Sequence, residues 1–320
     1  MEVIIIQKTL MYAVPLLIVA LAGVFAERSG VINLALEGEM IFGAFCGAMV
    51  GSLLARKNSA LLDKPQLIFV LLMLIAAVSG ALFSLLLSYS AINLKADQTI
   101  GGTALNMLAP AIVNTIALAF FNQEKVVMPA NFKSYAIKNP DVNPFLQIFI
   151  DKAYISTYIV IFVFIVLSIW MYKTKTGLRL RACGEHPQAA ASAGISVYKM
   201  RYLGTTISGA LAGLGGYVYI ATTAGGAAES GVAGMGFLAL AIMIFGNWNP
   251  LWIALGAMLF GFLKCVGAVS GLIPFLQSTG LPGYFYNIIP YFVVLVVLAF
   301  TNGKSGCPKA EGIPYDKGQR

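Results

Sequence analysis

Long apolar runs recur along almost the whole of this 320-residue chain. A helix of about 20 apolar residues crosses a bilayer. Runs of this kind predict nine membrane segments, at residues 4–25, 31–55, 66–92, 100–121, 153–172, 202–222, 235–245, 251–270 and 284–301. Only 11% of the residues are charged, against about 25% in soluble domains. The sequence therefore predicts an all-α, polytopic membrane helix bundle of about nine spans, formed by a single domain over residues 1–320.

Two of these runs are interrupted or short. Asn33, Glu37 and Glu39 interrupt the second run, and residues 235–245 are too few to cross a bilayer alone. Non-helical backbone at membrane depth is tolerated only where protein buries it or a cavity wets it. We therefore expect broken or re-entrant helices at both places.

Glycines at four-residue spacing occur in several predicted helices. Examples are Gly43 and Gly47 in the second run and Gly209 with Gly213 in the sixth. Small residues at this spacing allow helix backbones to approach closely in a bilayer. The pattern predicts tight packing of a rigid bundle in preference to hinges.

The main polar interruption is the segment 173–201, KTKTGLRLRACGEHPQAAASAGISVYKMR, which gathers basic residues around the single acid Glu185. A short basic loop between spans marks the cytoplasmic face of a membrane protein. Pro187 suits a first helical position and Gly194 a helix end, so residues 188–193 predict a short docking helix. A helix this short is marginal in water and must gain order by packing. A plain basic loop that only sets orientation is the alternative.

This orientation places the tail, residues 302–320, in the cytoplasm and the N-terminus outside. The segments expected inside carry more Lys and Arg than those expected outside, as the positive-inside rule requires.

Several function classes are disfavoured by what the chain contains. His186 is the single histidine, and the four cysteines lack the paired spacing of a zinc site or disulfide framework. No phosphate-binding G-x-x-x-x-G-K-[ST] loop occurs. The net charge of +8 resides largely in loops beside spans, where it sets topology, so it does not indicate nucleic-acid binding. We expect a non-enzyme without a metal or cofactor of its own.

Ionisable and polar groups inside spans are candidate functional residues. Glu37 and Glu39 lie two positions apart and so point to different helix faces. One can face a pathway while the other caps a half-helix. Acid/base catalysis by the two together is disfavoured. Lys264 either snorkels or pairs with a carboxylate.

A polar stripe is predicted on the fourth span. Thr99, Thr103 and Asn106 follow i, i+4, i+7 spacing on one helix face. The stripe either lines a path for uncharged hydroxylated molecules or ties helices together by hydrogen bonds.

Four segments carry a family resemblance: ERSGVINLALEGEMIFGAF, ADQTIGGTALNMLAP, TKTGLRLRACGEHPQAAASAGI and PKAEGIPYDKGQR. The chain resembles ABC importer permeases of the ribose, nucleoside and branched-chain amino acid group, most closely the shorter permease of bacterial nucleoside uptake systems. The resemblance implies a subunit that moves nucleosides by alternating access in a bacterial plasma (inner) membrane.

The resemblance also implies site residues. By position, the translocation path includes Asn33, Glu37, Glu39, and the region from Glu229 to Phe237. The coupling element that enters a groove on an ATPase lies in residues 177–195. Its candidate residues are Arg179, Arg181, Gly184, Glu185, Pro187, Ala189, Ala190 and Gly194.

The implied partners are a homologous second permease, giving a heterodimer, one or more cytoplasmic ABC ATPase subunits, and an extracytoplasmic binding protein or lipoprotein. ATP and Mg would bind to the ATPase. Simple sugars and branched-chain amino acids are the alternative cargoes. An ion-gradient-driven carrier using Glu37, Glu39 or Glu229 is the rival class, and it would not need the segment 173–201.

Overall fold

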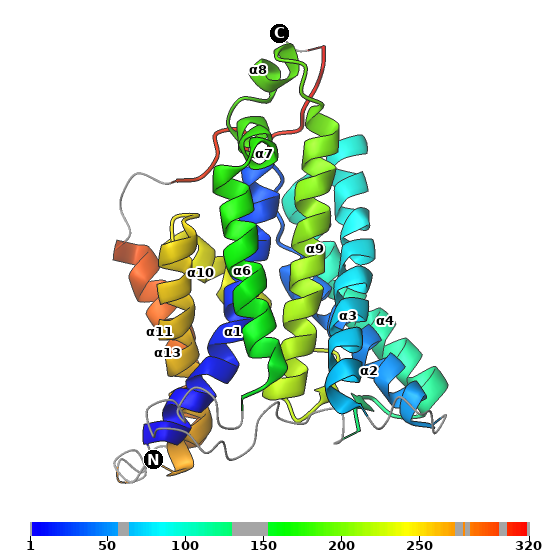
Figure 1. The fold of residues 1–320 in the computed structure, drawn as a ribbon, viewed down its shortest axis with the longest axis vertical. Helices are drawn as coiled ribbons and strands as arrows, with labels where there is room; N and C mark the ends of the chain where they lie inside the picture. The colour runs from blue at the N-terminus through cyan, green and yellow to red at the C-terminus, as the bar shows by residue number, and fades with distance from the viewer. Residues whose placement is uncertain are drawn as a thin grey trace.

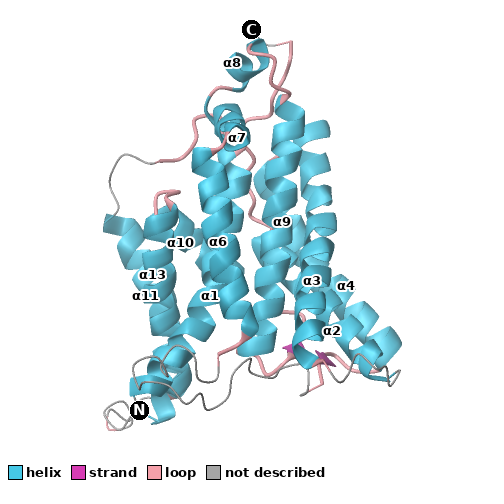
Figure 2. Ribbon diagram, in the orientation of Figure 1, coloured by secondary structure: helices cyan, strands magenta, loops and turns pink. Residues whose placement is uncertain are grey.

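The computed structural model describes residues 2–56, 64–129, 153–272, 278, 282–300 and 306–318, and helices account for most of them (Figure 1, Figure 2). The helices are α1 (Glu2–Arg28), α2 (Leu36–Arg56), α3 (Pro65–Ser88), α4 (Gln98–Phe121), α6 (Ile155–Lys173), α7 (Lys175–Glu185), α8 (Pro187–Ser192), α9 (Val197–Thr222), α10 (Met235–Phe245), α11 (Pro250–Val269) and α13 (Gly283–Phe300). A π-helical turn, Tyr89–Asn93, extends α3, and a 3-10 turn, Ser270–Leu272, follows α11. Two short strands, β1 (Val126–Val127) and β2 (Ala227–Ala228), pair antiparallel.

Six helices in the described part of the chain are long and apolar enough to cross a membrane: α1, α2, α3 with its π turn, α4, α6 and α11. The predicted membrane helix bundle is confirmed to that extent, whereas the predicted count of about nine spans is not. The helix α9 is 26 residues long but rich in Gly, Ser and Thr, which lowers its hydropathy. The helix α10 has only 11 residues.

The helix α9 lies at the centre of the bundle, packed against α1, α2 and α3. Its glycines allow this closeness. A Cβ added at Gly213 would lie 2.3 Å from the carbonyl oxygen of Ala76 on α3, and one added at Gly43 on α2 would lie 2.3 Å from the Cα of Gly213. The backbones therefore touch directly where three helices meet, as the glycine spacing predicts.

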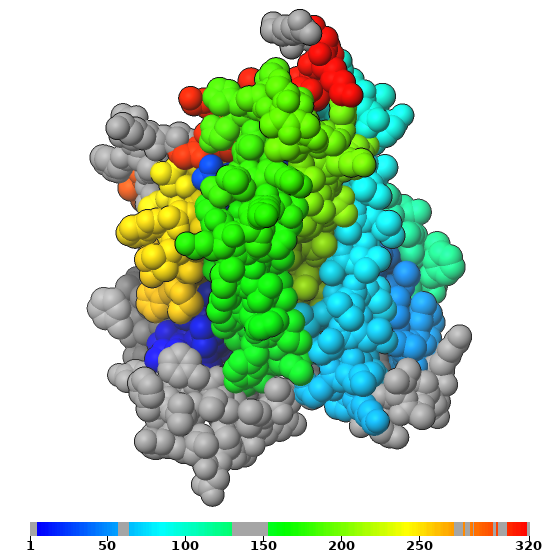
Figure 3. All heavy atoms as spheres, turned by 45° about the horizontal axis from the view of Figure 1, so that its top comes forward, coloured from blue at the N-terminus to red at the C-terminus, as the bar shows by residue number. Residues whose placement is uncertain are grey.

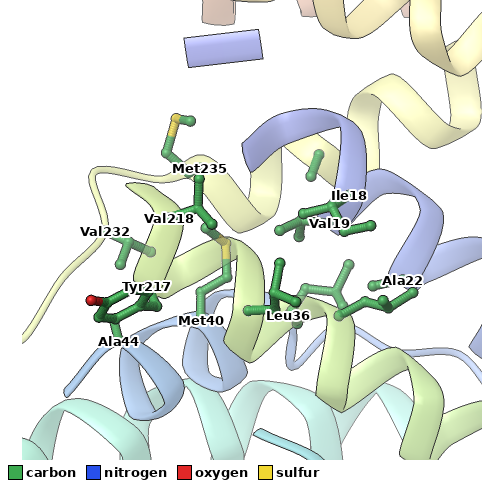
Figure 4. Packing of buried hydrophobic residues seen from close by; sticks show 14 of the residues in the cluster. Ile18, Val19, Ala22, Leu36, Met40, Ala44, Tyr217, Val218, Val232 and Met235 are labelled. Carbon is green, nitrogen blue, oxygen red and sulfur yellow. The ribbon is translucent and has the colours of Figure 1, made fainter. Parts of the chain in front are cut away.

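The two ends of the bundle differ. The N-terminal end of α1 lies at the bottom of Figure 1, whereas α7, α8 and the C-terminal segment lie at the top. The short helix α10 begins inside the bundle. Figure 4 shows Val232 and Met235, at its start, beside Tyr217, Val218 and Met40, and all five are buried.

Candidate functional site

The segment between α1 and α2 is an interruption inside the bundle that buried Asn33 holds together. The side-chain amide of Asn33 donates to both carboxylate oxygens of Glu39, at 3.2 and 3.0 Å, and to the hydroxyl of Ser208 on α9, at 2.9 Å. Its oxygen accepts from the backbone N–H of Ala35 at 3.0 Å. Asn33, Glu39 and Ser208 are all 0% exposed. The network therefore fixes the shape of the interruption, and the carboxylate of Glu39 is enclosed within it.

Glu37 has a different partner, the start of α10. Its two oxygens accept from the backbone N–H groups of Gly234, at 2.9 Å, and Gly236, at 2.6 Å. The first N–H groups of a helix have no partner within that helix, and they favour a negative charge. The helix α2 is continuous through Gly38, so Glu37 and Glu39 point to different neighbours, as their spacing predicts. Glu37 thus caps a half-helix about 200 positions further along the chain.

The backbone turns sharply just before α10. Ala233 and Gly234 both have positive φ, at 52° and 69°. The carbonyl of Ala233 accepts from the hydroxyl of Tyr291 at 2.7 Å and from the ammonium of Lys264 at 3.3 Å. Lys264 also donates to the Tyr291 hydroxyl at 2.8 Å. Of the two alternatives for Lys264, snorkelling or pairing with a carboxylate, its hydrogen bonds show neither: they go to a carbonyl and a phenol, which together secure this turn.

The predicted polar stripe on α4 divides into two parts. Asn106 accepts from the N–H of Gly38 at 2.7 Å and donates to the carbonyl of Leu34 at 2.6 Å, so it ties α4 to the start of α2. Thr99 and Thr103 are exposed, and the hydroxyl of Thr103 donates to the carbonyl of Thr99 at 2.9 Å. Helix tying therefore describes Asn106, and the two threonines leave a polar surface on a membrane helix.

Two hollows lie at opposite ends of α4. The β-side hollow, of about 640 Å³, is lined by Asn114, Gln123, Glu124, Lys125, Glu229 and Ser230. The second hollow, of about 230 Å³, is lined by Ile32, Lys95, Ala96, Asp97, Gln98, Thr99, Gly312 and Pro314. It is called the strap-side hollow, after the C-terminal segment 306–318 (the strap) to which Gly312 and Pro314 belong.

The structure therefore separates the predicted pathway residues. Asn33, Glu37, Glu39 and Asn106 meet around the start of α2. Phe237 lies in the first turn of α10 and is half exposed, at 51%. Glu229 instead lines the β-side hollow, with its carboxylate 3.7 Å from the ammonium of Lys125.

The short helix predicted at residues 188–193 is present as α8, with Pro187 in its first turn and Gly194 beyond its end at a φ of 79°. Its faces differ. Ala190 is buried, at 5% exposure, in a small cluster with Cys183, Val197 and Tyr315. Ala189 is exposed. The face that carries Ala189 is therefore the free one, and Ala190 anchors α8 to its own chain.

The segment before α8 is a second helix, α7, which the sequence does not predict. A Cβ at Gly184 would lie 2.4 Å from the carbonyl oxygen of Arg28, so α7 lies directly against the end of α1. A carboxylate oxygen of Glu185 lies 3.9 Å from Nη1 of Arg28. The guanidinium carbon of Arg181 lies over the ring of Tyr172, 5.0 Å from its centroid. Arg179 is exposed. The basic residues of this segment therefore divide between anchoring α7 and facing solvent.

These features define a membrane-embedded bundle with interrupted helices and a short helix raised on one end, which is the arrangement of a transport subunit. The chain belongs to the family described as branched-chain amino acid transport system / permease component, whose sequence profile matches residues 5–298. It is a transport subunit and not an enzyme.

Curated relatives match along nearly the whole chain. The guanosine ABC transporter permease protein NupQ of Bacillus subtilis is 39% identical over 99% of this chain and 98% of its own length. The nucleoside ABC transporter permease protein NupC of Lactococcus lactis is 36% identical over 98% and 97%. A second Bacillus subtilis permease, the guanosine ABC transporter permease protein NupP, is 26% identical over 92% and 81%. No solved structure matches the chain.

Proposed function

We propose that this chain is one of two homologous permeases of an ATP-driven importer that carries nucleosides inward across a bacterial plasma membrane. The observation that carries the proposal is α8: a helix anchored to its own chain by Ala190, with Ala189 exposed beside it, raised on one end of a membrane bundle. Two relatives of this chain are named as transporters of guanosine or nucleosides, which favours nucleosides over sugars and branched-chain amino acids.

The proposed topology has nine membrane segments, namely α1 to α4, α6, α9, α10, α11 and α13. The basic segment 173–201 faces the cytoplasm, and the N-terminus faces outside. Support comes from Figure 1, in which the N-terminus and α8 lie at opposite ends of the bundle. Because Glu37 caps α10 inside the protein, the short α10 has no need to reach both membrane surfaces.

The proposed path runs along α4. Thr99 borders the strap-side hollow and Asn114 the β-side hollow, with Thr103 exposed between them on the same helix face. Polar groups on a membrane helix are costly against lipid, so a second permease is expected to cover this face and leave the path between the two subunits. Bacillus subtilis has two such guanosine permeases, NupQ and NupP, and both are related to this chain.

In this proposal Asn33, Glu37, Glu39 and Asn106 shape the path without contacting the substrate. Each has its polar atoms engaged in hydrogen bonds within the chain. The exposed groups Thr99, Thr103 and Phe237 face the path. Glu229 belongs to its outer mouth.

The proposed energy source lies on a separate subunit. ATP and Mg bind to a cytoplasmic ABC ATPase, which receives the exposed face of α8, and an extracytoplasmic binding protein delivers the substrate to the β-side hollow. Closing of the ATPase subunits moves α8, and the bundle alternates between outward- and inward-facing arrangements.

The test is reconstitution of the purified complex in vesicles with the ATPase side accessible. Tritiated guanosine should move in the import direction only when Mg-ATP and the ATPase subunit are both present. Unlabelled uridine should compete, and ribose and leucine should not. Competition by leucine alone would identify a different cargo. Concentration of guanosine by this chain alone, driven by a proton or sodium gradient, would instead establish an ion-driven carrier.

A further inference from the structure

The segment 306–318, here called the strap, crosses the end of the bundle that carries α7 and α8. Its first residue, Gly306, donates its N–H to the side-chain oxygen of Asn247, in the turn between α10 and α11. At its other end Asp316 lies 2.9 Å from the ammonium of Lys95, in the link between α3 and α4. Figure 3 shows strap atoms in red over this end, between the green α7–α8 segment and the cyan α3. The strap thus joins two inter-helix connections that are far apart in sequence.

Between these ends the strap is attached to the docking element. The N–H of Ala310 donates to the carbonyl of Gly184, the penultimate residue of α7, at 2.9 Å. Tyr315 shares a buried cluster with Ala190 of α8, and its ring meets that of Tyr198 edge to face at 5.5 Å. A displacement of α8 must therefore displace the strap or break these contacts.

A second attachment is the side chain of Arg201, at the start of α9. It is 1% exposed, and its Nη1 donates to the carbonyl of Ile313 at 2.9 Å. A buried guanidinium is costly without acceptors. Nε and Nη2 of this guanidinium have no hydrogen-bond partner among the described residues, so the bond to Ile313 is what attaches it to the strap. At the Asp316 end the ion pair is exposed at 43% on both side chains and contributes little.

The strap also forms one wall of the strap-side hollow. Gly312 and Pro314 line it on one side, and Lys95, Gln98 and Thr99 line it on the other. Thr99 is the first member of the polar stripe of α4, so the hollow lies where the proposed path reaches this end.

Gln98 is a buried polar group of the hollow with unused bonding capacity. It is 3% exposed, and its oxygen accepts from the N–H of Ile32 at 2.7 Å. Its amide nitrogen has no hydrogen-bond partner among the described residues. Asp97, by contrast, is occupied in capping α4 through the N–H groups of Thr99 and Ile100. A buried amide donor without a partner is unfavourable, and an acceptor atom of a solute in the hollow would satisfy it.

We propose that the strap-side hollow is a release subsite for the neutral, hydroxylated substrate, and that the strap is a gate over it which α8 opens. The ion pair of Lys95 with Asp316 is the latch, and Gln98 is the donor that the departing solute meets. This inference rests on the proposed function, because it assumes that substrate leaves along α4 toward the ATPase.

The test measures access to the hollow in the assembled transporter. In a complex whose permease lacks the four native cysteines, Gln98→Cys supplies one thiol for a membrane-impermeant maleimide. The gate predicts slow labelling, faster labelling during Mg-ATP turnover, and protection by saturating guanosine. Thr99→Cys, in the same hollow, serves if Gln98→Cys does not assemble. Because Thr99 is exposed, only the acceleration by Mg-ATP and the protection by guanosine are measured with it.

The latch is tested by charge reversal in the same background. Asp316→Lys and Lys95→Asp each replace attraction by repulsion, and we expect labelling to accelerate by about threefold to fivefold, the range that an exposed pair can contribute. The double reversal should return labelling to within about twofold of the parent. Lys317→Glu, an exposed charge reversal one position away, is the matched control and should leave labelling unchanged.

The outcomes separate the gate from the function. The latch is overturned if each single reversal is labelled no faster than Lys317→Glu. It is also overturned if the double reversal is labelled as fast as either single reversal. Labelling indifferent to Mg-ATP overturns the link to α8, and labelling indifferent to guanosine overturns the subsite. Any of these results leaves the proposed function intact if the parent complex, which keeps Gln98 and Thr99, imports guanosine. A parent complex that imports no nucleoside contradicts the function itself.

Discussion

Removing the carboxylate of Glu37 should detach the start of α10 from α2. Glu37 holds the N–H groups of Gly234 and Gly236 at 2.9 and 2.6 Å. A hydrogen bond to a charged group contributes about 1.5–3 kcal/mol, so the two together contribute roughly 3–6 kcal/mol. Part of this offsets the cost of burying a carboxylate that is only 8% exposed. We expect Glu37→Ala to lower the free energy of unfolding by about 3 kcal/mol, a factor of more than a hundred in the equilibrium constant.

The free energy of unfolding of Glu37→Gln should lie between those of the parent chain and Glu37→Ala, because Gln keeps one acceptor oxygen and turns an amide donor toward the other N–H. Glu229→Gln is the matched control. Its carboxylate forms only an exposed pair with Lys125, so the free energy of unfolding should change by less than about 0.5 kcal/mol.

The assay is unfolding of the purified chain in mixed micelles with increasing dodecyl sulfate, followed by tryptophan fluorescence. Hydrogen exchange at the amides of Gly234 and Gly236 gives the local readout. Both amides should exchange much faster in Glu37→Ala than in Glu229→Gln. If Glu37→Ala has the same free energy of unfolding as the parent chain, and its Gly234 and Gly236 amides exchange at the parent rates, the capping argument is wrong.

Three further predictions concern other parts of the molecule. Ala189→Arg, on the exposed face of α8, should abolish ATP-dependent uptake with little change in thermal unfolding. Ala190→Arg should also destabilise the chain by roughly 2–4 kcal/mol, because it forces a charge into a closed cluster. Parallel measurements of uptake and unfolding separate the two variants. Burial and the neighbouring carboxylate of Glu311 raise the pKa of Cys307 to about 12, so its thiolate is scarce at pH 8. Its alkylation by iodoacetamide should therefore be at least about a hundredfold slower than that of free cysteine and rise with pH, and Glu311→Gln should accelerate it. Gly213→Ala should cost about 1–3 kcal/mol in the same dodecyl sulfate assay, because its Cβ would fall 2.3 Å from a backbone oxygen of α3 that cannot move without separating the helices.

Much of the helical architecture could be predicted from single runs of sequence. Apolar length alone locates helices such as α3 and α6 to within a few residues, because a bilayer-spanning helix needs little else. Pro187 and Gly194 delimit α8 by the same local logic. These features depend on residues that are close together in the chain.

The helix α7 could not be predicted in this way. Its glycines and basic residues indicate a loop, and it is ordered by contact of Gly184 with the carbonyl of Arg28, more than 150 positions earlier. The free and anchored faces of α8 depend in the same way on Tyr315, far along the chain.

The candidate site shows the same division. The spacing of Glu37 and Glu39 predicts that they face apart, which the structure confirms. Their partners could not be predicted, because Gly236 and Ser208 come from other helices. For Lys264 the sequence left open whether it snorkels or pairs with a carboxylate, and its hydrogen-bond partners in the structure, the carbonyl of Ala233 and the hydroxyl of Tyr291, could not be predicted from charge.

The position of the strap in the chain has a consequence for biogenesis. Ribosomes synthesise the strap after every helix that it touches. More than 100 further residues must be made after Arg201 before the carbonyl of Ile313 can accept its hydrogen bond. Until then α8 lacks its packing against Tyr315, and the buried cluster around Ala190 is incomplete. A nascent chain, or a truncated product that lacks the strap, would therefore carry α7 and α8 without the contacts of Ala310 and Tyr315 that hold them.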